Sequence, residues 1–450
     1  MKRLCIILVA VAAICPAERL TMEQMVERGI ARYPSVRVAQ AEVRQAAAGI
    51  QLARTAYLPK VDAVAGINRA TRNNTFGLLL PSQIISPISG PVLGTNALGS
   101  AWGSTVGLLA TWEPIDFGLR AANVAVAEAA RKHAGTGIAR AQLGGAALIA
   151  ESALTWLAAA QTAIVAQAGI DRASELERIT TALVKAELRP GAELSLAQAE
   201  AAAARMQLVR TKQAAEEAKA ALSALLGDSN IELAEGKLLS LPARNTDETP
   251  AMEQNPDVTA IDAAVAESEA KLHALDRAYF PRIAVQATSY ARGSGAMPDG
   301  RLLGGVNGLG PNIQNWGVGF TVTFPLMELP SIRARKAAEA ARLDAEKARR
   351  EQLLVDLTIQ RDKALAAYRS ALELAKLTPA LIASAKTEVA QIRARYQAGL
   401  GTALEVADAQ RRLTQAEIDD SLARLGIWRA RLAVYLAVGD LTPFLREVSH

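Results

Sequence analysis

Two acidic residues close together on one predicted helix are the strongest candidates for chemistry in this sequence. Glu405 and Asp408 lie at the start of a predicted helix over 402–436, and their spacing of three residues places both carboxylates on one helix face. Acids near a helix N-terminus are also favoured by the helix dipole. We align these positions with Ser195 and Gln198 of an earlier repeat, so capping does not by itself require carboxylates. Helix stabilisation and a functional carboxylate pair both stay open.

The histidines and glycines give no sign of a catalytic, metal or phosphate site. His133, His273 and His450 are the only histidines, too few and too scattered for a zinc site or a base-nucleophile pair. We expect His133 and His273 to be solvated surface residues. The glycines of 304–310 lack the lysine and following helix of a phosphate loop. We therefore expect no enzyme, no catalytic residue, no metal ligand and no cofactor.

The first residues have the layout of a secretory signal. Residues 1–17 combine a basic start, an apolar run over 4–14 and a small-residue end, which predicts export and cleavage after the last of them. Both cysteines, Cys5 and Cys15, lie in this segment. Cys15 could alternatively be the acylated first residue of a lipoprotein, but Ile14 stands where that processing wants a small residue. The expected mature chain has no thiol.

Composition indicates thin helices that pack closely. Aromatic residues make up only 4% of the 450 residues, and alanine is abundant. No stretch beyond the signal approaches twenty apolar residues, which argues against a helical membrane anchor. The net charge of +5 comes from acids and bases interleaved along the helices, which gives no case for nucleic acid binding.

Four segments alternate with a period of two, which predicts strands with one apolar face. Two of them, 61–67 and 283–287, each follow a proline, and a long loop rich in Gly, Pro, Ser and Asn leads to the next strand. The apolar positions of the other two segments are Trp102, Val106, Leu108, Ala110 and Trp112, and then Trp316, Val318, Phe320, Val322 and Phe324. We therefore expect two β-hairpins.

Each hairpin is followed by a very long predicted helix, and the whole unit occurs twice. Apolar residues after Gly118 recur in steps of four and three, as in a coiled-coil seam, over a length of roughly 100 Å. The Gly-Asp pair at Gly227 returns at Gly439, 212 residues later (439 − 227), which indicates a tandem duplication. The predicted organisation is a signal 1–17, a first repeat 18–228, a linker 229–250, a second repeat 251–440 and a C-terminal tail 441–450. The first repeat comprises a helix, the hairpin 58–117, the long helix 119–188 and the short helix 192–226. The second repeat comprises a helix, the hairpin 280–326, the long helix 331–398 and the short helix 402–436.

These elements predict a mainly α-helical chain that cannot close a barrel alone. Four strands leave two open edges. Each short return helix covers only half of its long helix, and the helices that lead into the hairpins have the missing length, so they can pack end to end with the return helices. The linker 229–250 would then form a small collar midway along the long helices.

The sequence resembles the TolC-like outer-membrane efflux proteins, the outer membrane factor family. The resemblance covers essentially the whole mature chain through the duplicated unit, the helix breaks at Pro34 and Pro256, the strand end 112–118 and above all the segment 396–410. It implies a trimer, with twelve strands in one barrel in the outer membrane of a Gram-negative bacterium. It also implies an α-helical barrel of twelve long antiparallel coiled-coil helices in the periplasm.

The resemblance also implies roles for individual residues. Glu405 and Asp408 match acidic positions that ring the constricted periplasmic mouth in family members. Where some relatives hold this mouth closed with an arginine, this chain has Gly401, so we expect weaker or differently built closing links. The tip that docks on an adaptor protein would comprise Tyr396, Gly399, Leu400, Gly401 and Thr402, with Pro190 and Gly191 of the first repeat.

The spacing of the aromatic residues fits a membrane-spanning sheet. Trp102 and Trp112 are ten residues apart on one face, about 33 Å along a strand, which a tilt near 40° projects to roughly 25 Å, the height of a barrel's apolar band. We expect lipid to contact the girdle residues Trp102, Trp112, Trp316 and Phe324 together with Val106, Leu108, Val318, Phe320 and Val322, and expect Thr105, Gly107, Gly319 and Thr321 to face the lumen.

These observations predict a passive export channel. The expected partners are two further copies of the chain, a periplasmic adaptor (membrane fusion) protein, an inner-membrane pump and outer-membrane lipid, in a tripartite efflux or type I secretion system. One alternative is a porin-like barrel acting alone, which leaves the long helices unexplained. Another is a periplasmic coiled-coil adaptor, which leaves the four alternating strands unexplained.

Overall fold

A computed structural model describes residues 18–71, 99–234, 237–242, 252–297 and 301–449. The predicted signal 1–17, Cys15 included, lies outside the described residues, as do most of the first hairpin loop and part of the linker 229–250. The chain divides into two compact units, and each of them draws on both repeats. One unit comprises Met1–Val43, Ala134–Asp262 and Lys347–His450, and the other comprises Arg44–His133 and Ala263–Glu346.

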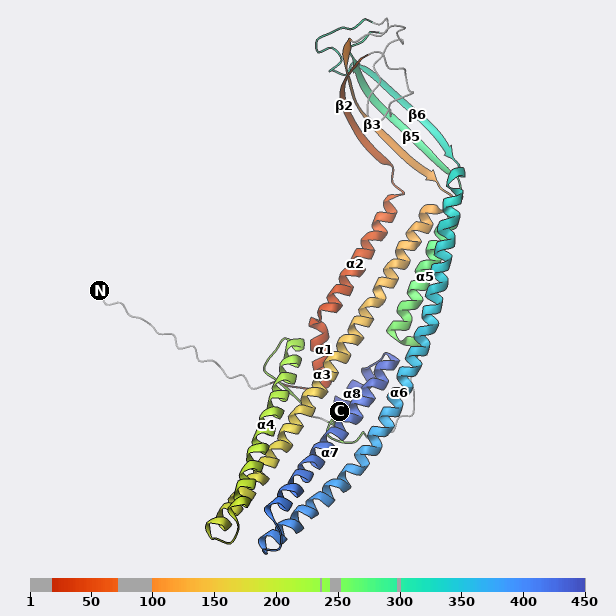
Figure 1. Cartoon of the computed structure of the whole chain (residues 1–450). Helices are drawn as coiled ribbons and strands as arrows, with labels where there is room; N and C mark the ends of the chain where they lie inside the picture. The colour runs from red at the N-terminus through yellow and green to blue at the C-terminus, as the bar shows by residue number, and fades with distance from the viewer. Residues whose placement is uncertain (1–17, 72–98, 235–236, 243–251, 298–300, 450) are drawn as a thin grey trace, which may run out of the picture. The chain divides into compact units, whose positions relative to one another are not determined.

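The second of these units contains one antiparallel four-stranded sheet (Figure 1). Its strand order is β2-β3-β5-β6, so the pairing of β3 with β5 joins the hairpins of the two repeats. Among the described residues, β2 and β6 each pair with one strand only, which leaves an open edge on either side. The strands are β2 (Lys60–Thr71), β3 (Ser100–Ile115), β5 (Arg282–Ser294) and β6 (Ile313–Thr323).

The strand register gathers the apolar residues on one face of the sheet. Trp112 lies opposite Val285, which in turn lies opposite Phe320, and on the same face Leu108 is in line with Trp316. Trp316 is 82% exposed and Phe320 78% exposed, so this chain leaves the apolar face uncovered there. The other face carries mainly polar and small residues: Thr105 with Arg292, Thr111 with Gln286, and Thr288 with Gly317.

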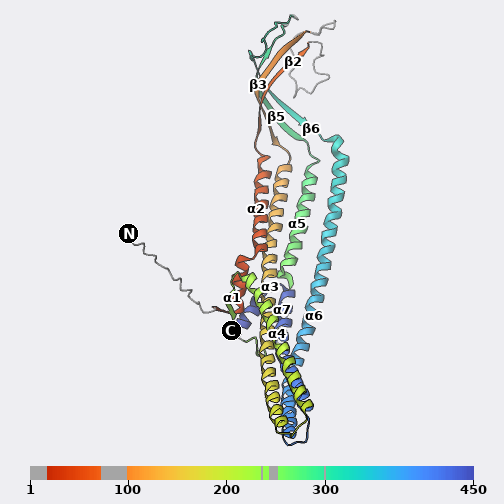
Figure 2. The same cartoon turned by 60° about the vertical axis from the view of Figure 1, so that its left-hand side comes forward.

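Helices continue from the strands in the same order, α2, α3, α5, α6, and run side by side (Figures 1 and 2). Neighbouring helices are joined by ion pairs: Arg54 of α2 to Glu128 of α3 at 3.4 Å, and Lys336 of α6 to Asp276 of α5 at 2.5 Å. The Nδ1 atom of His133 in α3 lies 2.8 Å from the Glu267 carboxylate in α5. His133 therefore makes a contact between helices, whereas we expected a solvated surface residue. The helices are α2 (Pro34–Thr55), α3 (Leu119–Lys185), α5 (Pro256–Arg277) and α6 (Leu329–Gln397).

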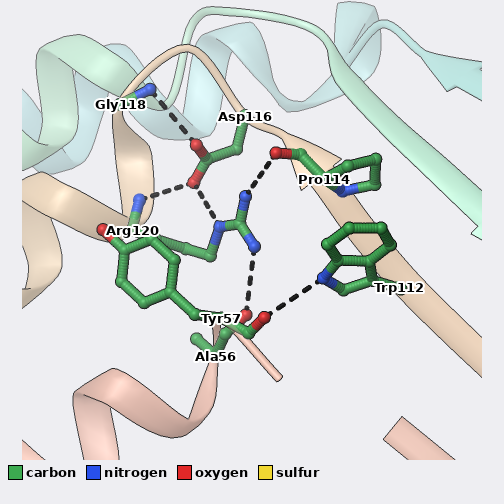
Figure 3. A network of polar contacts seen from close by, with 7 residues as sticks. All are labelled: Ala56, Tyr57, Trp112, Pro114, Asp116, Gly118 and Arg120. Atoms are coloured by element: carbon green, nitrogen blue, oxygen red, sulfur yellow. Dashed lines mark hydrogen bonds and ion pairs between the residues drawn. The ribbon is translucent and has the colours of Figure 1, made fainter. Parts of the chain in front are cut away.

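A buried ion pair fixes the junction between β3 and α3 (Figure 3). Asp116 accepts hydrogen bonds from the backbone N–H of Gly118 at 3.2 Å and of Arg120 at 2.6 Å, so it caps the first turn of α3. The Arg120 guanidinium donates to Asp116 at 3.0 Å and to the carbonyls of Ala56 and Pro114. Burial alone would raise the pKa of Asp116, but these N–H donors outweigh it and the pKa is lowered. One side chain thereby ties the end of α2 to the start of α3.

The other unit has a core made from five helices. Met25, Leu154, Leu222, Trp428 and Phe444 are fully buried there, and they come from α1, α3, α4, α7 and α8 respectively. A two-stranded parallel sheet of β1 (Glu18–Leu20) and β4 (Ile231–Leu233) borders this core. The remaining helices are α1 (Met22–Arg32), α4 (Gly191–Leu226), α7 (Ala403–Val438) and α8 (Thr442–Ser449), the last within the predicted tail.

The predicted helix over 331–398 is present as α6, whereas α3 differs from the sequence prediction in one respect. α6 continues through Pro379, and the carbonyl of Ala375, which loses its helical donor there, lies 3.4 Å from the Thr378 hydroxyl. α3 contains an 18-residue window apolar and long enough to cross a membrane, contrary to the expectation that none exists. That window is 44% buried within the chain, which fits an alanine-rich packing helix equally well.

The helix bounds also correct the alignment of the repeats. α4 and α7 each have 36 residues, and their first residues, Gly191 and Ala403, are 212 apart (403 − 191). The counterparts of Glu405 and Asp408 are therefore Glu193 and Leu196, and the alignment with Ser195 and Gln198 is wrong by two residues. The mainly helical fold with a four-stranded sheet and a tandem repeat is confirmed, and β1 and β4 add a short two-stranded sheet.

Candidate functional site at the helix tips

The two long helices reverse direction in turns of the same backbone geometry. Glu187 at φ 57° and Gly399 at φ 82° occupy equivalent left-handed positions after α3 and α6. In each turn the next N–H bonds back to the helix, from Leu188 to Leu183 and from Leu400 to Arg395, both at 2.9 Å. This is a Schellman termination in both repeats. The tips therefore differ in side chains rather than in backbone path.

The predicted carboxylate pair has partners within the chain. Glu405 accepts the N–H of Thr402 at 3.1 Å, and the Thr402 hydroxyl accepts the N–H of Glu405 at 3.3 Å, which is a capping box. Asp408 pairs with Arg411, whose guanidinium also reaches Glu200 of α4 at 2.9 Å. Helix stabilisation thus accounts for part of the role of Glu405, and Asp408 helps to join α7 to α4.

Tyr396 links the two tips. Its side chain is only 2% exposed, and its hydroxyl lies 3.0 Å from the Thr180 hydroxyl and 3.2 Å from the Glu193 carboxylate. Arg189 stacks on the Tyr396 ring at 4.9 Å and donates to its backbone carbonyl at 3.1 Å. Arg189 also lies 3.5 Å from Glu193. We call Arg189, Glu193 and Tyr396 the tip clasp.

Burial and charge keep the clasp tyrosine protonated. Burial raises the pKa of Tyr396 above 10.0, and the nearby Glu193 carboxylate adds to the rise although Thr180 opposes it. The hydroxyl therefore remains a donor at neutral pH, and its stabilising effect is lost only as the pH rises through this raised pKa. An apolar cluster beneath the clasp holds the helices together: Leu176, Ala197, Ala403, Val406 and Ala407.

The predicted docking residues divide into exposed and buried groups. Tyr396 and Gly401 are buried, whereas Pro190, Gly191, Gly399, Leu400 and Thr402 are exposed. Leu400 is 72% exposed, and its repeat counterpart Leu188, which the sequence analysis did not name, is 69% exposed. Arg189 and Glu193 were also missed. The repeat offset could have found Arg189, because it lies 212 residues before Gly401 (401 − 189), the position for which the resemblance implies a closing arginine in some relatives.

Three of the four predicted girdle residues are largely exposed in the unit that contains the sheet. Trp316, Phe324 and Trp112 are 82%, 61% and 44% exposed. The Trp112 indole donates to the Tyr57 carbonyl at 3.1 Å. Trp102 is partly buried, with the guanidinium of Arg69 at 5.3 Å from its ring.

The part of the chain that the structure describes holds no group of three or more His, Cys, Asp or Glu side chains able to bind a metal ion. The three histidines lie apart in the sequence, and the one with an acidic partner, His133, serves a helix–helix contact.

The family model of the outer membrane efflux proteins matches residues 26–228 and 250–440. The chain belongs to this family. It is therefore an efflux channel protein of the outer membrane, from a family of channels rather than enzymes. A search among curated proteins finds no match.

Solved outer-membrane channels share the fold. The CmeC channel of Campylobacter jejuni is 17% identical with a TM-score of 0.72, over 95% of this chain and 89% of that one. VceC of Vibrio cholerae is 17% identical with a TM-score of 0.71, over 93% and 96%. The MtrE channel of Neisseria gonorrhoeae, solved in an open state, is 20% identical with a TM-score of 0.68, over 93% and 88%.

Proposed function

We propose that three copies of this chain form one outer-membrane channel-tunnel that conducts substrates passively from an inner-membrane pump and a periplasmic adaptor to the exterior. The observation that carries the proposal is a four-stranded sheet with one exposed apolar face and two open edges. A bilayer cannot hydrogen-bond an open edge, so such a sheet is stable in lipid only when its edges are paired.

Threefold symmetry pairs both edges. If β6 of one copy pairs with β2 of the next, twelve strands close into a barrel without an edge. Trp316, Val318 and Phe320 then contact lipid, and Thr105, Gly319 and Thr321 line the lumen. The long helices extend into the periplasm. A porin-like barrel acting alone would not need such helices. Membership of the efflux family also argues against the periplasmic adaptor alternative.

The helix tips are the adaptor-docking surface in this proposal. Leu188 and Leu400 are exposed at equivalent positions of the two turns, where apolar side chains are otherwise costly to leave in water. Pro190, Gly191, Gly399 and Thr402 provide the surrounding exposed backbone. A coiled-coil hairpin of an adaptor could cover both leucines of each copy.

The periplasmic mouth is formed by the same tips. Three copies each of Glu405 and Asp408 would surround the threefold axis, and their negative charge would favour the passage of cations. Arg411 pairs with Asp408 and so neutralises part of this negative charge. In place of an arginine at Gly401, the tip clasp holds the mouth closed: Arg189 reaches Tyr396 from the other repeat.

Crosslinking and copurification test this function. We expect membrane extracts to yield a heat-modifiable trimer that copurifies, after crosslinking, with an adaptor and a pump. Leu188→Asp with Leu400→Asp should abolish the adaptor crosslink and leave the trimer intact. Val306→Asp, at a residue that is 74% exposed in the loop between β5 and β6, is the matched control and should keep the adaptor. A folded monomer in detergent would contradict the shared barrel. An adaptor crosslink that persists in the variant Leu188→Asp with Leu400→Asp would contradict the docking surface.

A further inference from the structure

A cavity of about 500 Å³, wide open to the surface, lies between α3, α5 and α6 in the unit that contains the sheet. Its volume is within the range of small-ligand sites. Part of the lining is apolar, with Leu119, Val126 and Leu275 among its residues, and part is charged, with Lys271, Arg335 and Glu339. An apolar wall beside both signs of charge suits an amphiphile with a zwitterionic headgroup.

The cavity adjoins the helix ends that connect to strands. Leu119 is the first residue of α3, four residues after β3 ends at Ile115. Leu275 lies in the last turn of α5, and β5 begins at Arg282. Under the proposed function, on which this inference rests, the strands cross the outer membrane. The cavity then lies beside the periplasmic leaflet, at the level of phospholipid headgroups.

One carboxylate oxygen in the cavity has no donor. Oε1 of Glu339 is buried and accepts no hydrogen bond. A buried acceptor without a partner destabilises the fold, and more so when it is charged. Lys271 lies 2.5 Å from Glu267 and also lines the cavity, and its ammonium carries three donors. Arg335 is exposed at the rim, where its guanidinium can bind a phosphate through two N–H groups.

We propose that this cavity binds the phosphoethanolamine headgroup of a membrane phospholipid. The phosphate lies toward Lys271 and Arg335, and the ammonium pairs with the carboxylate of Glu339 that lines the cavity. The glycerol end and the first methylenes cover the apolar wall at Leu119 and Leu275. A headgroup with a phosphate and no ammonium would leave Glu339 without a donor and place two anions together, so phosphatidylethanolamine should bind better than phosphatidylglycerol.

Lipid retention by the intact trimer tests the proposal. The full-length protein is reconstituted in nanodiscs with equal amounts of phosphatidylethanolamine and phosphatidylglycerol, extracted with mild detergent and examined by native mass spectrometry. We expect about one retained phosphatidylethanolamine per subunit, in roughly tenfold preference, equivalent to about 1.4 kcal/mol. Equal retention of both lipids would overturn the proposal, and so would retention of neither by an intact trimer.

Variants separate the two charged groups. Glu339→Gln keeps the side-chain size but removes the anion, and should abolish the preference while the trimer persists. Arg335→Gln should reduce retention of both lipids. Glu328→Gln, an exposed acid outside the cavity, is the control and should change neither. An unchanged preference in Glu339→Gln would overturn the assignment.

Soluble glycerophosphoethanolamine should compete poorly, and full competition by it would contradict a lipid ligand. Failure to form a trimer would count against the proposed function, whereas a normal trimer without lipid preference counts against this inference alone.

Discussion

The two repeats end their long helices on the same backbone turn but carry different chemistry on it. The first tip has Glu187, Arg189 and Pro190 where the second has Gly399, Gly401 and Thr402. The first tip supplies a cation that reaches across to Tyr396, and the second supplies a capping box. The two repeats thus share the turn, but the cation of the tip clasp lies in the first repeat and its tyrosine in the second.

The strand-to-helix junctions differ in a similar way. Asp116 and Arg120 form a buried ion pair in the first repeat, and their counterparts are Glu328, which is exposed, and Ile332, which is buried. One junction is specified by hydrogen bonds and the other by apolar packing. A buried pair is intolerant of the loss of one partner, whereas an apolar contact weakens gradually.

The largest effect is expected at the first junction. Arg120→Ala should lower the free energy of unfolding by about 3–5 kcal/mol, because it leaves the Asp116 carboxylate buried without its cation. Ile332→Val in the second repeat should cost only about 0.5–1.5 kcal/mol. Thermal unfolding of the purified protein, followed by circular dichroism at pH 7, measures both.

The same junction should respond to acid. Because the folded pKa of Asp116 is lowered, its contribution to stability is present above the unfolded pKa of about 3.9 and is lost as the pH falls through the folded pKa. Asp116→Asn should remove this part of the acid response.

Equal losses of unfolding free energy at pH 7 for Arg120→Ala and Ile332→Val would show that the ion pair has no special role at the first junction.

A smaller effect is expected from the capping box. Thr402→Ala should destabilise the first turn of α7 by about 1 kcal/mol, because the N–H of Glu405 loses the Thr402 hydroxyl as its acceptor. The start of α4, where Pro190 provides no side-chain cap, is the internal reference. Hydrogen exchange should speed up at residues 403–406 and stay unchanged at 191–194. Unchanged exchange in α7 would rule out a capping role for Thr402.

The smallest effects are expected at the two left-handed residues. Glu187→Gly should relieve an unfavourable φ and stabilise the first tip by a few tenths of a kcal/mol to about 1 kcal/mol. Gly399→Ala should destabilise the second tip by about 1 kcal/mol. Opposite signs of the two shifts in melting temperature are the expected result, and shifts of the same sign would show that the turns are not equivalent.

Much of the fold could be predicted because its strands and long helices follow from the periodic spacing of apolar residues along the chain. The alternation at 316–324 and the heptad steps after Gly118 depend on neighbouring residues alone. The pairing of β3 with β5 was not predicted, since no local signal relates strands from different repeats. The alignment failed at Glu405 because the predicted short helices begin 210 residues apart (402 − 192), whereas α4 and α7 begin 212 apart (403 − 191).

The candidate site was predicted only in part, for a physical reason. The link between Arg189 and Tyr396 joins residues 207 positions apart, so it depends on the packing of α3, α4 and α6. The capping box was readable from the spacing of Thr402 and Glu405, and the sequence analysis assigned Glu405 without it. The exposure of Leu188 and Leu400 also required the fold.

Single-channel recording in planar bilayers tests the tip clasp most directly. Arg189→Ala with Tyr396→Phe removes the cation and the hydroxyl while keeping the apolar ring in place. Each lost hydrogen bond is worth about 1 kcal/mol, or roughly fivefold in the ratio of closed to open channels. We expect a several-fold higher open probability in the double variant. Arg205→Ala, which removes an ion pair with Glu177 between α4 and α3 of the first repeat, should behave like the wild type. An unchanged open probability in the double variant would contradict closure by a link between the two repeats.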